Sequence, residues 1–312
     1  MKLILANPRG FCAGVDRAIM IVEQALELFG APLYVRHEIV HNRHIVADFV
    51  DRGVVFVETL EDVPPDSILI FSAHGVSQQV VTEARARNLQ VIDATCPLVT
   101  KVHMEAARYA RNQTHILLVG HAGHAEVLGT MGQVPATRIT LVEDTEQAHR
   151  VTVPAPENVA LLTQTPLSVD ETAAITAILA RRFPALQRPG KQDICYATQN
   201  RQDAVKAMAP RCDVLLVVGS PNSSNANRLV EVAQEYGAQR AYLIDGPADL
   251  LPHMTFGANT VGLSAGASTP EHVVQAVINA LAPSSQEAFQ FTEENVHFGL
   301  PASLRRAQQQ VA

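Results

Sequence analysis

The stretch Val91-Ile92-Asp93-Ala94-Thr95-Cys96-Pro97 joins a short apolar run to a cysteine that a proline follows at the start of a helical pattern. The same arrangement occurs twice more. Leu3-Ile4-Leu5-Ala6 leads through a polar loop to Cys12, and Gln192-Asp193-Ile194 leads directly to Cys195. In parallel α/β sheets, functional groups collect at the carboxyl ends of the strands. We therefore predict that three α/β subdomains each contribute one thiolate to a shared centre.

Short β-branched runs alternate with amphipathic helical patterns along most of the chain. Strand–helix alternation of this kind predicts parallel sheets built from βαβ units. Residues 15–29 place apolar side chains at helical spacing, and Gly30 closes that helix. A Ser168-x-x-Glu171 capping box starts a helix that runs to Arg182. The predicted strands are 3–6, 33–35, 54–57, 68–71, 91–93, 115–119, 139–142, 159–162, 214–218, 242–244 and 261–264.

The C-terminal segment is more polar than the rest of the chain. Thr269-Pro270 opens a helix that ends near Leu281, with the proline at a position that the first helical turn tolerates. After Ala282 the chain runs through Pro283-Ser284-Ser285 to a Gln-rich end. We predict that this segment is a tail that wraps the surface.

The composition is that of a globular protein with a large core: 312 residues, of which 47% are hydrophobic and 18% charged. The formal net charge of −7 and the lack of any Lys/Arg-rich run argue against a nucleic-acid partner. An anionic ligand must therefore be held by local donors. No apolar run approaches a membrane span and no secretory signal opens the chain, so we expect a cytoplasmic protein with no membrane partner.

In a reducing compartment the four cysteines predict metal ligands, catalytic groups or buried fillers rather than disulfides. Cys212 precedes the strand 214–218 and is interpreted as a buried small side chain. Cys12, Cys96 and Cys195 occupy loop or helix-start positions, where the helix dipole stabilises a thiolate. Three thiolates could hold zinc with an open position or an iron–sulfur cubane with one open iron. The spacing does not choose between these two metal centres.

Two motif-like matches in the sequence are not supported by the residues around them. His37-Glu38-Ile39-Val40-His41 matches the HExxH pattern of zinc proteases, whose histidines must share one helical face. Here the match follows the strand 33–35 and the next helix begins near Asn42, which argues against a metalloprotease. The chain contains no P-loop or dinucleotide fingerprint. Gly120-x-x-Gly123 and Gly262-x-x-x-Gly266 are interpreted as tight turns, so bound NAD or ATP is not expected.

Polar side chains gather at the predicted strand ends, where they suit an anion. Histidines and small polar residues there offer donors to phosphoryl oxygens, although each loop histidine could simply be solvated. Glu126, which closely follows His124, is a candidate acid because a nearby anion raises a carboxyl pKa. The alternative is an exposed helix glutamate. The candidate donors are His41, His74, His124, Ser223, Asn225 and Ser268.

Taken together and in order, these motifs resemble those of the 4-hydroxy-3-methylbut-2-enyl diphosphate reductases. This family catalyses the last step of the methylerythritol phosphate route to isoprenoids. The resemblance extends over about residues 2 to 281 and its multi-part pattern is highly specific. The motifs that carry it are Asn7-Pro8-Arg9-Gly10-Phe11-Cys12-Ala13-Gly14-Val15, Arg36-His37-Glu38-Ile39-Val40-His41-Asn42, Ser72-Ala73-His74-Gly75-Val76, Asp93-Ala94-Thr95-Cys96-Pro97, Gly120-His121-x-x-His124-x-Glu126-Val127, Thr163-Gln164-Thr165 and Ser223-Ser224-Asn225.

The resemblance implies one [4Fe-4S] cluster per chain, held by Cys12, Cys96 and Cys195. It implies an α/β fold of three subdomains with small parallel sheets, in a pseudo-threefold arrangement around this central cluster. The boundaries that we predict for it are 14–96 for the first subdomain, 97–193 for the second, 194–282 with the N-terminal strand 1–13 for the third, and 283–312 for the C-terminal tail.

The resemblance also implies the reaction and its site. The substrate would bind through its hydroxyl oxygen at the open iron and be reduced to isopentenyl and dimethylallyl diphosphate. Flavodoxin or ferredoxin would supply the electrons. Glu126 would deliver protons and Thr165 would order the hydroxyl group. The residues implied for diphosphate binding are His41, His74, His124, Ser223, Ser224, Asn225 and Ser268.

Two positions depart from the family pattern, and two other functions compete with this interpretation. Pro166 follows Thr165 where a second threonine is common, and Ala226 follows Asn225 where a small hydroxyl residue is common. A hydro-lyase of the aconitase type would have a closely spaced cysteine pair, which this sequence lacks. A non-catalytic zinc or iron–sulfur regulator would be expected to carry a basic surface for reading DNA.

Overall fold

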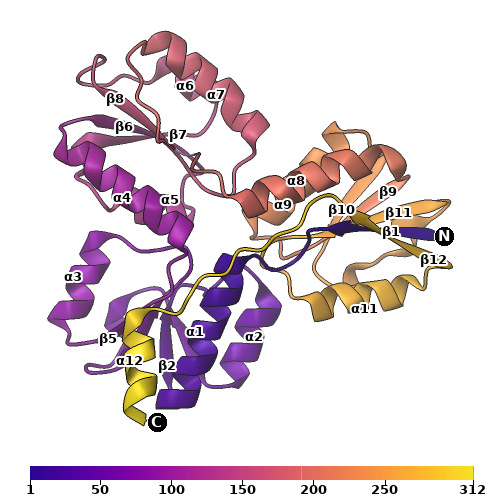
Figure 1. Cartoon of the computed structure of the whole chain (residues 1–312), viewed down its shortest axis with the longest axis horizontal. Helices are drawn as coiled ribbons and strands as arrows, with labels where there is room; N and C mark the ends of the chain where they lie inside the picture. Colours follow the sequence, from indigo (N-terminus) through magenta and orange to yellow (C-terminus); the bar gives the residue numbers. More distant parts are fainter. Residues whose placement is uncertain (191, 312) are drawn as a thin grey trace. The chain divides into compact units, whose positions relative to one another are not determined.

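The computed structural model describes residues 1–190 and 192–311, and its strands form three sheets (Figure 1). All strand pairs are parallel, as the alternation of strands and helices predicts. The strands are β1 (Lys2–Asn7), β2 (Leu33–Arg36), β3 (Val54–Val57), β4 (Ile68–Phe71), β5 (Gln90–Asp93), β6 (His115–Val119), β7 (Ile139–Val142), β8 (Val159–Thr163), β9 (Val214–Val218), β10 (Arg240–Ile244), β11 (Thr260–Ala265) and β12 (Ser285–Gln290).

Helices follow most of the strands, so that each sheet is built from strand–helix units. The longest helices are the three that directly follow Cys12, Cys96 and Cys195 and the one that Ser168 caps. The helices are α1 (Ala13–Phe29), α2 (Arg43–Asp51), α3 (Gln78–Ala86), α4 (Pro97–Arg111), α5 (Ala125–Met131), α6 (Thr145–Arg150), α7 (Val169–Arg182), α8 (Tyr196–Met208), α9 (Ser224–Glu235), α10 (Pro252–Thr255), α11 (Glu271–Leu281) and α12 (Ala302–Val311).

The chain divides into two compact units. Unit 1 consists of Met1–Val15, His41–Ile45 and Tyr196–His297, and it contains the sheet with strand order β10-β9-β11-β1-β12. Its two faces are covered by different helices. Residues of α8 and α9 form one buried cluster with the strands, and residues of α11 form the other. Because successive strand residues point to opposite faces and helices cover both faces, the central strands β9 and β11 are almost wholly buried.

Unit 2 consists of Asp16–Val40, Val46–Cys195 and Phe298–Ala312, and it contains the two smaller sheets. One has the strand order β3-β2-β4-β5 and the other β7-β6-β8. Helices α6 and α7 cover one face of the β7-β6-β8 sheet, and α4 and α5 cover the other. Three parallel sheets with helices confirm the predicted fold class, whereas the predicted subdomain boundaries stay a prediction.

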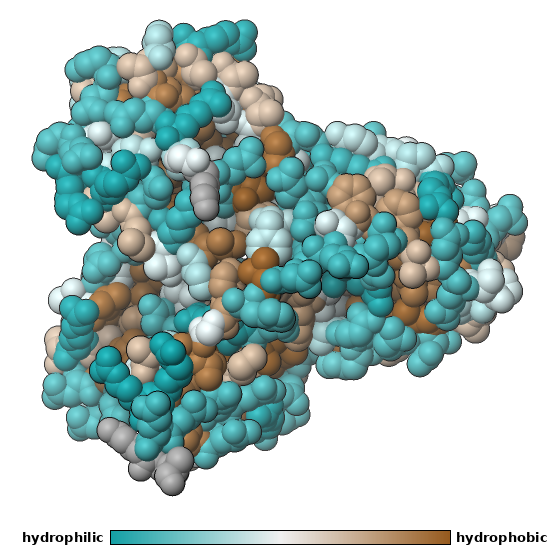
Figure 2. Space-filling model, in the orientation of Figure 1, coloured by the Kyte–Doolittle hydropathy of each residue, from teal (hydrophilic) through white to brown (hydrophobic). Residues whose placement is uncertain are grey.

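The apolar stripes face inward and leave a mostly polar surface. The visible face of the molecule in Figure 2 is largely hydrophilic, with smaller hydrophobic areas between the polar residues. In the described part of the chain, no helix combines the length and the hydrophobicity that crossing a membrane requires.

The internal strands and the main helices agree with the sequence predictions, and the C-terminal segment contains a strand and a helix that the sequence does not predict. Ser285–Gln290 forms strand β12, which pairs in parallel with β1 from Lys2↔Ser285 to Asn7↔Gln290. Further on, Ala302–Val311 forms α12, and Leu304 is buried. The β12 sequence is polar because this edge strand is held by its backbone hydrogen bonds and leaves most side chains exposed.

The prediction that Gly262 lies in a tight turn is wrong. Gly262 lies inside β11, where a Cβ atom would come within 2.7 Å of the Cys212 sulfur and 3.2 Å of the Met208 methyl carbon. The strand therefore needs glycine for close packing rather than for a turn. Cys212 is buried, as predicted, and fills the space that Gly262 leaves.

Replacing Gly262 with alanine should destabilise the protein by about 1–3 kcal/mol, because the added methyl group overpacks a buried site. Replacing Cys212 with alanine in the same chain should recover most of this loss, because it removes the clashing sulfur. The free energies of unfolding in urea would measure both effects. A double variant no more stable than Gly262→Ala would contradict the packing argument.

Candidate functional site

Cys12, Cys96 and Cys195 occupy equivalent local positions. Each is half-buried and directly precedes a helix: α1, α4 and α8 respectively. No disulfide joins cysteines in the described part of the chain. A thiol at a helix N-terminus has its thiolate form stabilised by the helix dipole. The backbone N–H of each cysteine donates to a carbonyl of a neighbouring loop: Cys12 to Ala267 (3.2 Å), Cys96 to Ala73 (3.0 Å) and Cys195 to Thr165 (3.1 Å).

The fourth cysteine, Cys212, differs from these three in its burial and in the state of its thiol. Cys212 is 5% exposed, and its sulfur donates to the Met208 carbonyl oxygen. Burial raises the pKa of its thiol to about 11. Cys212 therefore stays protonated at neutral pH, as expected of a buried packing residue.

Glu126 is a buried acid rather than an exposed helix residue. It is the second residue of α5, and only 3% of it is exposed. Its carboxylate accepts two hydrogen bonds from Thr165, one from the backbone N–H (2.6 Å) and one from the hydroxyl (2.9 Å). Burial raises the pKa of Glu126 to about 7, although both bonds from Thr165 oppose this. The carboxyl group can therefore hold and release a proton near neutral pH.

Replacing Thr165 with valine should raise the pKa of Glu126 further, because the lost hydroxyl stabilises the carboxylate. The expected shift is about one pH unit, since one charged hydrogen bond is worth on the order of 1.5 kcal/mol. Infrared titration of the Glu126 carboxyl band, with Glu126→Gln as the blank, would measure it. Thr165→Ser should restore the original value. An unchanged titration in Thr165→Val would contradict the assigned hydrogen bond.

His124 caps the helix that carries Glu126. Its Nδ1 atom accepts the Glu126 backbone N–H at 3.1 Å. In a neutral ring this leaves the proton on Nε2, so the outer edge of His124 is a hydrogen-bond donor. The His74 ring lies edge-on to it, with ring centroids 6.0 Å apart.

His74 is placed by a tightly packed loop at the end of β4. Its Nδ1 lies 3.3 Å from the Ser72 hydroxyl. Gly75 follows with φ +78°, and a Cβ atom there would come within 2.6 Å of the His103 ring, so the loop requires glycine. Burial lowers the pKa of His103 to about 4, which keeps the ring behind this loop neutral at physiological pH.

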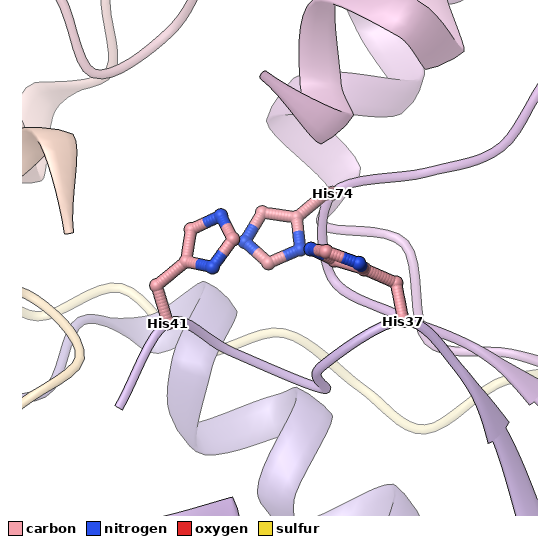
Figure 3. Close-up of side chains that lie close together, drawn as sticks. All are labelled: His37, His41 and His74. Atoms are coloured by element: carbon pink, nitrogen blue, oxygen red, sulfur yellow. The ribbon is translucent and has the colours of Figure 1, made fainter. Parts of the chain in front are cut away.

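The loop between β2 and α2 carries His37 and His41, which Figure 3 shows on irregular backbone rather than on a helix. His37 and His41 therefore do not share the helical face that the zinc-protease pattern requires. The His37 ring lies edge-on to the His74 ring in the same unit, with centroids 5.8 Å apart. His37 has φ +62°, and its Nδ1 lies 2.8 Å from a Glu58 carboxylate oxygen.

The short segment His41–Ile45 belongs to unit 1, where polar contacts fix it. Asn42 caps α2 by accepting the N–H groups of His44 and Ile45. The His44 Nε2 atom donates to the Asp245 carbonyl oxygen at 2.8 Å, and the Ser268 hydroxyl donates to the His41 carbonyl oxygen at 2.9 Å. The backbone of His41 is therefore held against the ends of β10 and β11.

Asn225 and its neighbours form a donor-rich turn in unit 1 at the start of α9. Ser223 caps this helix, and Ser223, Asn225 and Ser268 are all largely buried. The Asn225 side-chain oxygen accepts the Ala267 N–H at 2.9 Å, which leaves its buried NH₂ group without a hydrogen-bond acceptor in the described structure. A buried donor without a partner is costly, so it indicates a site for an acceptor such as a phosphoryl oxygen.

The comparisons with known proteins agree on one family. Residues 3–282 match the family model described as LytB protein. The chain belongs to the LytB protein family. Its relatives include proteins named 4-hydroxy-3-methylbut-2-enyl diphosphate reductase. One from Methylococcus capsulatus is 57% identical and matches 98% of this chain and 99% of the relative. One from Pseudomonas savastanoi is 56% identical and matches 98% of both chains.

Two solved structures are similar to this LytB chain. The E-1-hydroxy-2-methyl-but-2-enyl-4-diphosphate reductase from Plasmodium falciparum is 38% identical, with a TM-score of 0.96 over 99% of this chain and 98% of that one. A second structure, titled as (E)-4-hydroxy-3-methyl-but-2-enyl diphosphate reductase, is 31% identical, with a TM-score of 0.65 over 90% of this chain and 99% of that one. As a LytB protein, the chain is an enzyme of the oxidoreductase class.

The predicted site residues of this LytB protein divide between the two units. The structure describes each of them, and each lies at a strand end or a helix start. Unit 1 contains Cys12, His41, Ser223, Ser224, Asn225 and Ser268. Unit 2 contains His74, Cys96, His124, Glu126, Thr165 and Cys195.

One departure from the family pattern has a structural reason. Ala226 is fully buried, and a Cβ atom on Gly219 or Gly266 would come within 2.6 Å or 3.0 Å of its methyl group. Alanine therefore allows α9 to start close to the ends of β9 and β11. Nothing in the structure explains Pro166.

Three buried or half-buried cations were not predicted from the sequence, although each contacts a cysteine loop. Arg17 donates to the Thr95 carbonyl oxygen at 3.0 Å, and Lys101 donates to the Gln192 carbonyl oxygen at 3.0 Å. Arg201 donates to the Gly10 carbonyl oxygen and the Phe11 carbonyl oxygen, at 2.8 and 3.0 Å for the closest pairs. A sequence signal exists: Arg17 and Lys101 each follow a cysteine by five positions, and Arg201 follows one by six.

Proposed function

We propose that the chain reduces (E)-4-hydroxy-3-methylbut-2-enyl diphosphate to isopentenyl and dimethylallyl diphosphate, as the last step of the methylerythritol phosphate pathway. The observation that carries this proposal is the buried Glu126–Thr165 pair. It provides a proton near neutral pH, and the Thr165 carbonyl oxygen accepts the N–H of Cys195. Thr165 thus contacts both the proposed acid, Glu126, and one proposed metal ligand, Cys195. The names of the relatives support the substrate.

Cys12, Cys96 and Cys195 would hold one [4Fe-4S] cluster per chain. The chemistry of the donors fits this group, because soft thiolates suit iron–sulfur clusters and all three cysteines sit where a thiolate is stabilised. With three protein ligands, one iron would be left open for the substrate. When bound, the cluster supplies single electrons and a Lewis acid for the substrate hydroxyl group.

Hydrogen-bond donors at strand ends and helix starts would hold the diphosphate. In unit 1 the Asn225 NH₂ group is buried without an acceptor, and the Ser223 and Ser268 hydroxyls lie in the same donor-rich region. In unit 2 the Nε2 side of His124 is a donor. Contacts of this kind, remote from the reacting carbon, fix the orientation of the substrate. The full set is His41, His74, His124, Ser223, Ser224, Asn225 and Ser268.

Glu126 would deliver the protons, and Thr165 would order the substrate hydroxyl group while it holds the Glu126 carboxylate. The reaction consumes two electrons and two protons per substrate. The hydroxyl group leaves as water, and the allylic carbon framework takes up one proton at either end. This accounts for two isomeric products. A bound diphosphate would add negative charge near Glu126 and keep it protonated for donation.

Flavodoxin or ferredoxin would provide the electrons one at a time, since the sequence has no nicotinamide motif. We place the enzyme in the cytoplasm, without a nucleic-acid or membrane partner. The net charge of −7 and the absence of a basic run argue against a nucleic-acid partner.

Anaerobic purification tests the proposal. The protein should be brown, contain about four irons per chain, and consume the hydroxymethylbutenyl diphosphate with reduced methyl viologen as donor. A colourless zinc protein would contradict the cofactor. A brown protein inert with this substrate would favour a hydro-lyase or a non-catalytic iron–sulfur protein.

A further inference from the structure

We propose that Arg17, Lys101 and Arg201 are positioning residues that fix the backbone of the three cysteine loops. Each cation lies on the helix that follows one cysteine and binds the loop that carries another. This inference rests on the proposed three-cysteine centre and adds residues that act on that centre through the cysteines.

Two of these contacts lie within unit 2. Arg17 is on α1, behind Cys12, and its guanidinium binds the carbonyl oxygen of Thr95, the residue before Cys96. Lys101 is on α4, behind Cys96, and its ammonium binds Gln192 and Asp193 in the loop before Cys195.

Arg201 makes the corresponding contact within unit 1. It lies on α8, behind Cys195, is fully buried, and donates to the carbonyl oxygens of Gly10 and Phe11 just before Cys12. Three independent contacts of the same kind at equivalent positions argue against a chance arrangement.

The cations hold carbonyl oxygens, so they fix the backbone of the loops directly. Arg17 makes three such bonds, to Thr95 at 3.0 Å, to Gly299 at 2.8 Å and to Asp93 at 3.5 Å, and it is 8% exposed. Within the described residues Arg17 forms no ion pair, whereas Lys101 pairs with Asp193 and Arg201 with Glu294. Arg17 therefore combines a fixed backbone contact with a positive charge beside the Cys96 loop, where it also interacts with the charge of Asp93.

Two effects are expected when Arg17 is replaced by methionine. A looser Cys96 loop should speed iron loss to a chelator by roughly tenfold, the usual size for removing an outer partner of a metal ligand. Loss of the positive charge should lower the reduction potential of the centre, because potentials of iron–sulfur clusters fall as local negative charge increases. Arg17→Lys keeps the charge but loses the forked contact, so its potential should stay near that of the wild type while its iron loss is intermediate.

Arg182 provides a matched control in the same unit. It also binds two loop carbonyl oxygens, those of Ala148 and Val151, both at 2.6 Å, but neither belongs to a cysteine loop. Arg182→Met should lower the thermal midpoint without changing iron retention, the potential or the electron paramagnetic resonance spectrum of the reduced protein.

Lys101 gives a second test in case Arg17→Met folds poorly, since the Lys101 side chain is 29% exposed. Lys101→Met should also speed iron loss, and Lys101→Arg should restore it. The inference is overturned if Arg17→Met and Lys101→Met match Arg182→Met in iron retention, potential and spectrum. It falls together with the proposed function only if the wild-type protein binds no iron–sulfur cluster.

Discussion

Replacing Glu126 with glutamine is expected to lower turnover by about 10²- to 10⁴-fold, the usual contribution of a general acid. Glutamine has nearly the same shape but cannot donate an acidic proton. Iron content and substrate affinity should stay close to those of the wild type. Steady-state kinetics with a reduced dye, iron analysis and calorimetric binding of the substrate would measure the three quantities.

The same group predicts how the enzyme responds to pH. A donor with a pKa of about 7 is protonated below that pH, so kcat/KM should fall as pH rises through about 7. Stability should fall in the same direction. The folded protein binds the Glu126 proton more tightly than the unfolded chain does, so stability is lost as pH rises from about 4.5 towards 7 and above. The loss for this group is on the order of 3 kcal/mol, and Glu126→Gln should not show it.

Glu146 offers a matched control, because it is an exposed helix glutamate that pairs with Arg150. Glu146→Gln should retain wild-type turnover and the wild-type pH profile. Normal turnover in Glu126→Gln would remove Glu126 from the proposed role, whatever the state of the metal centre.

Replacing Cys96 with serine is expected to remove most of the bound iron and to lower turnover by more than about a hundredfold, beyond the usual loss for an outer partner. A serine hydroxyl is a hard and weakly acidic donor, so it cannot substitute for a thiolate in an iron–sulfur centre. The loss should be equally large for Cys12→Ser and Cys195→Ser, because the three cysteines occupy equivalent positions before a helix. Iron per chain and the visible absorbance spectrum after anaerobic purification would measure it.

Cys212 supplies the matched cysteine control. Its sulfur is buried and donates to the Met208 carbonyl oxygen, a bond that a serine hydroxyl can also make. Cys212→Ser should cost about 1 kcal/mol of stability and leave iron and turnover unchanged. If Cys96→Ser kept full iron and Cys212→Ser lost it, the assignment of the ligands would be wrong.

Much of the fold could be predicted from the sequence because its core strands are short, β-branched and bounded by polar turns. Strands β4, β6 and β9 have the predicted bounds, since these strands are largely buried on both faces and their hydrophobic signal is strong. Strand β12 could not be predicted in this way. Its stability comes from backbone pairing with β1, which leaves no hydrophobic pattern in its sequence.

In the candidate site, too, some features could be predicted from the local sequence, whereas others depend on how the chain packs. The cysteines and Glu126 could be proposed from motifs and from their places after strands. The raised pKa of Glu126 could not, because it depends on burial that only the packed structure provides. Arg17 and Arg201 were missed because their partners are backbone carbonyls far away in sequence, which carry no side-chain signature.

The position of β1 between β11 and β12 has a consequence for synthesis of the chain. The strand made first waits for partners that begin at Thr260 and Ser285, and at about 5–20 residues per second this delay is on the order of ten seconds or more. Both sheets of unit 2 are complete in sequence before then. The proposed metal centre, which needs the loop after β1, would therefore form on the completed polypeptide, and its iron would be delivered after translation rather than to the nascent chain.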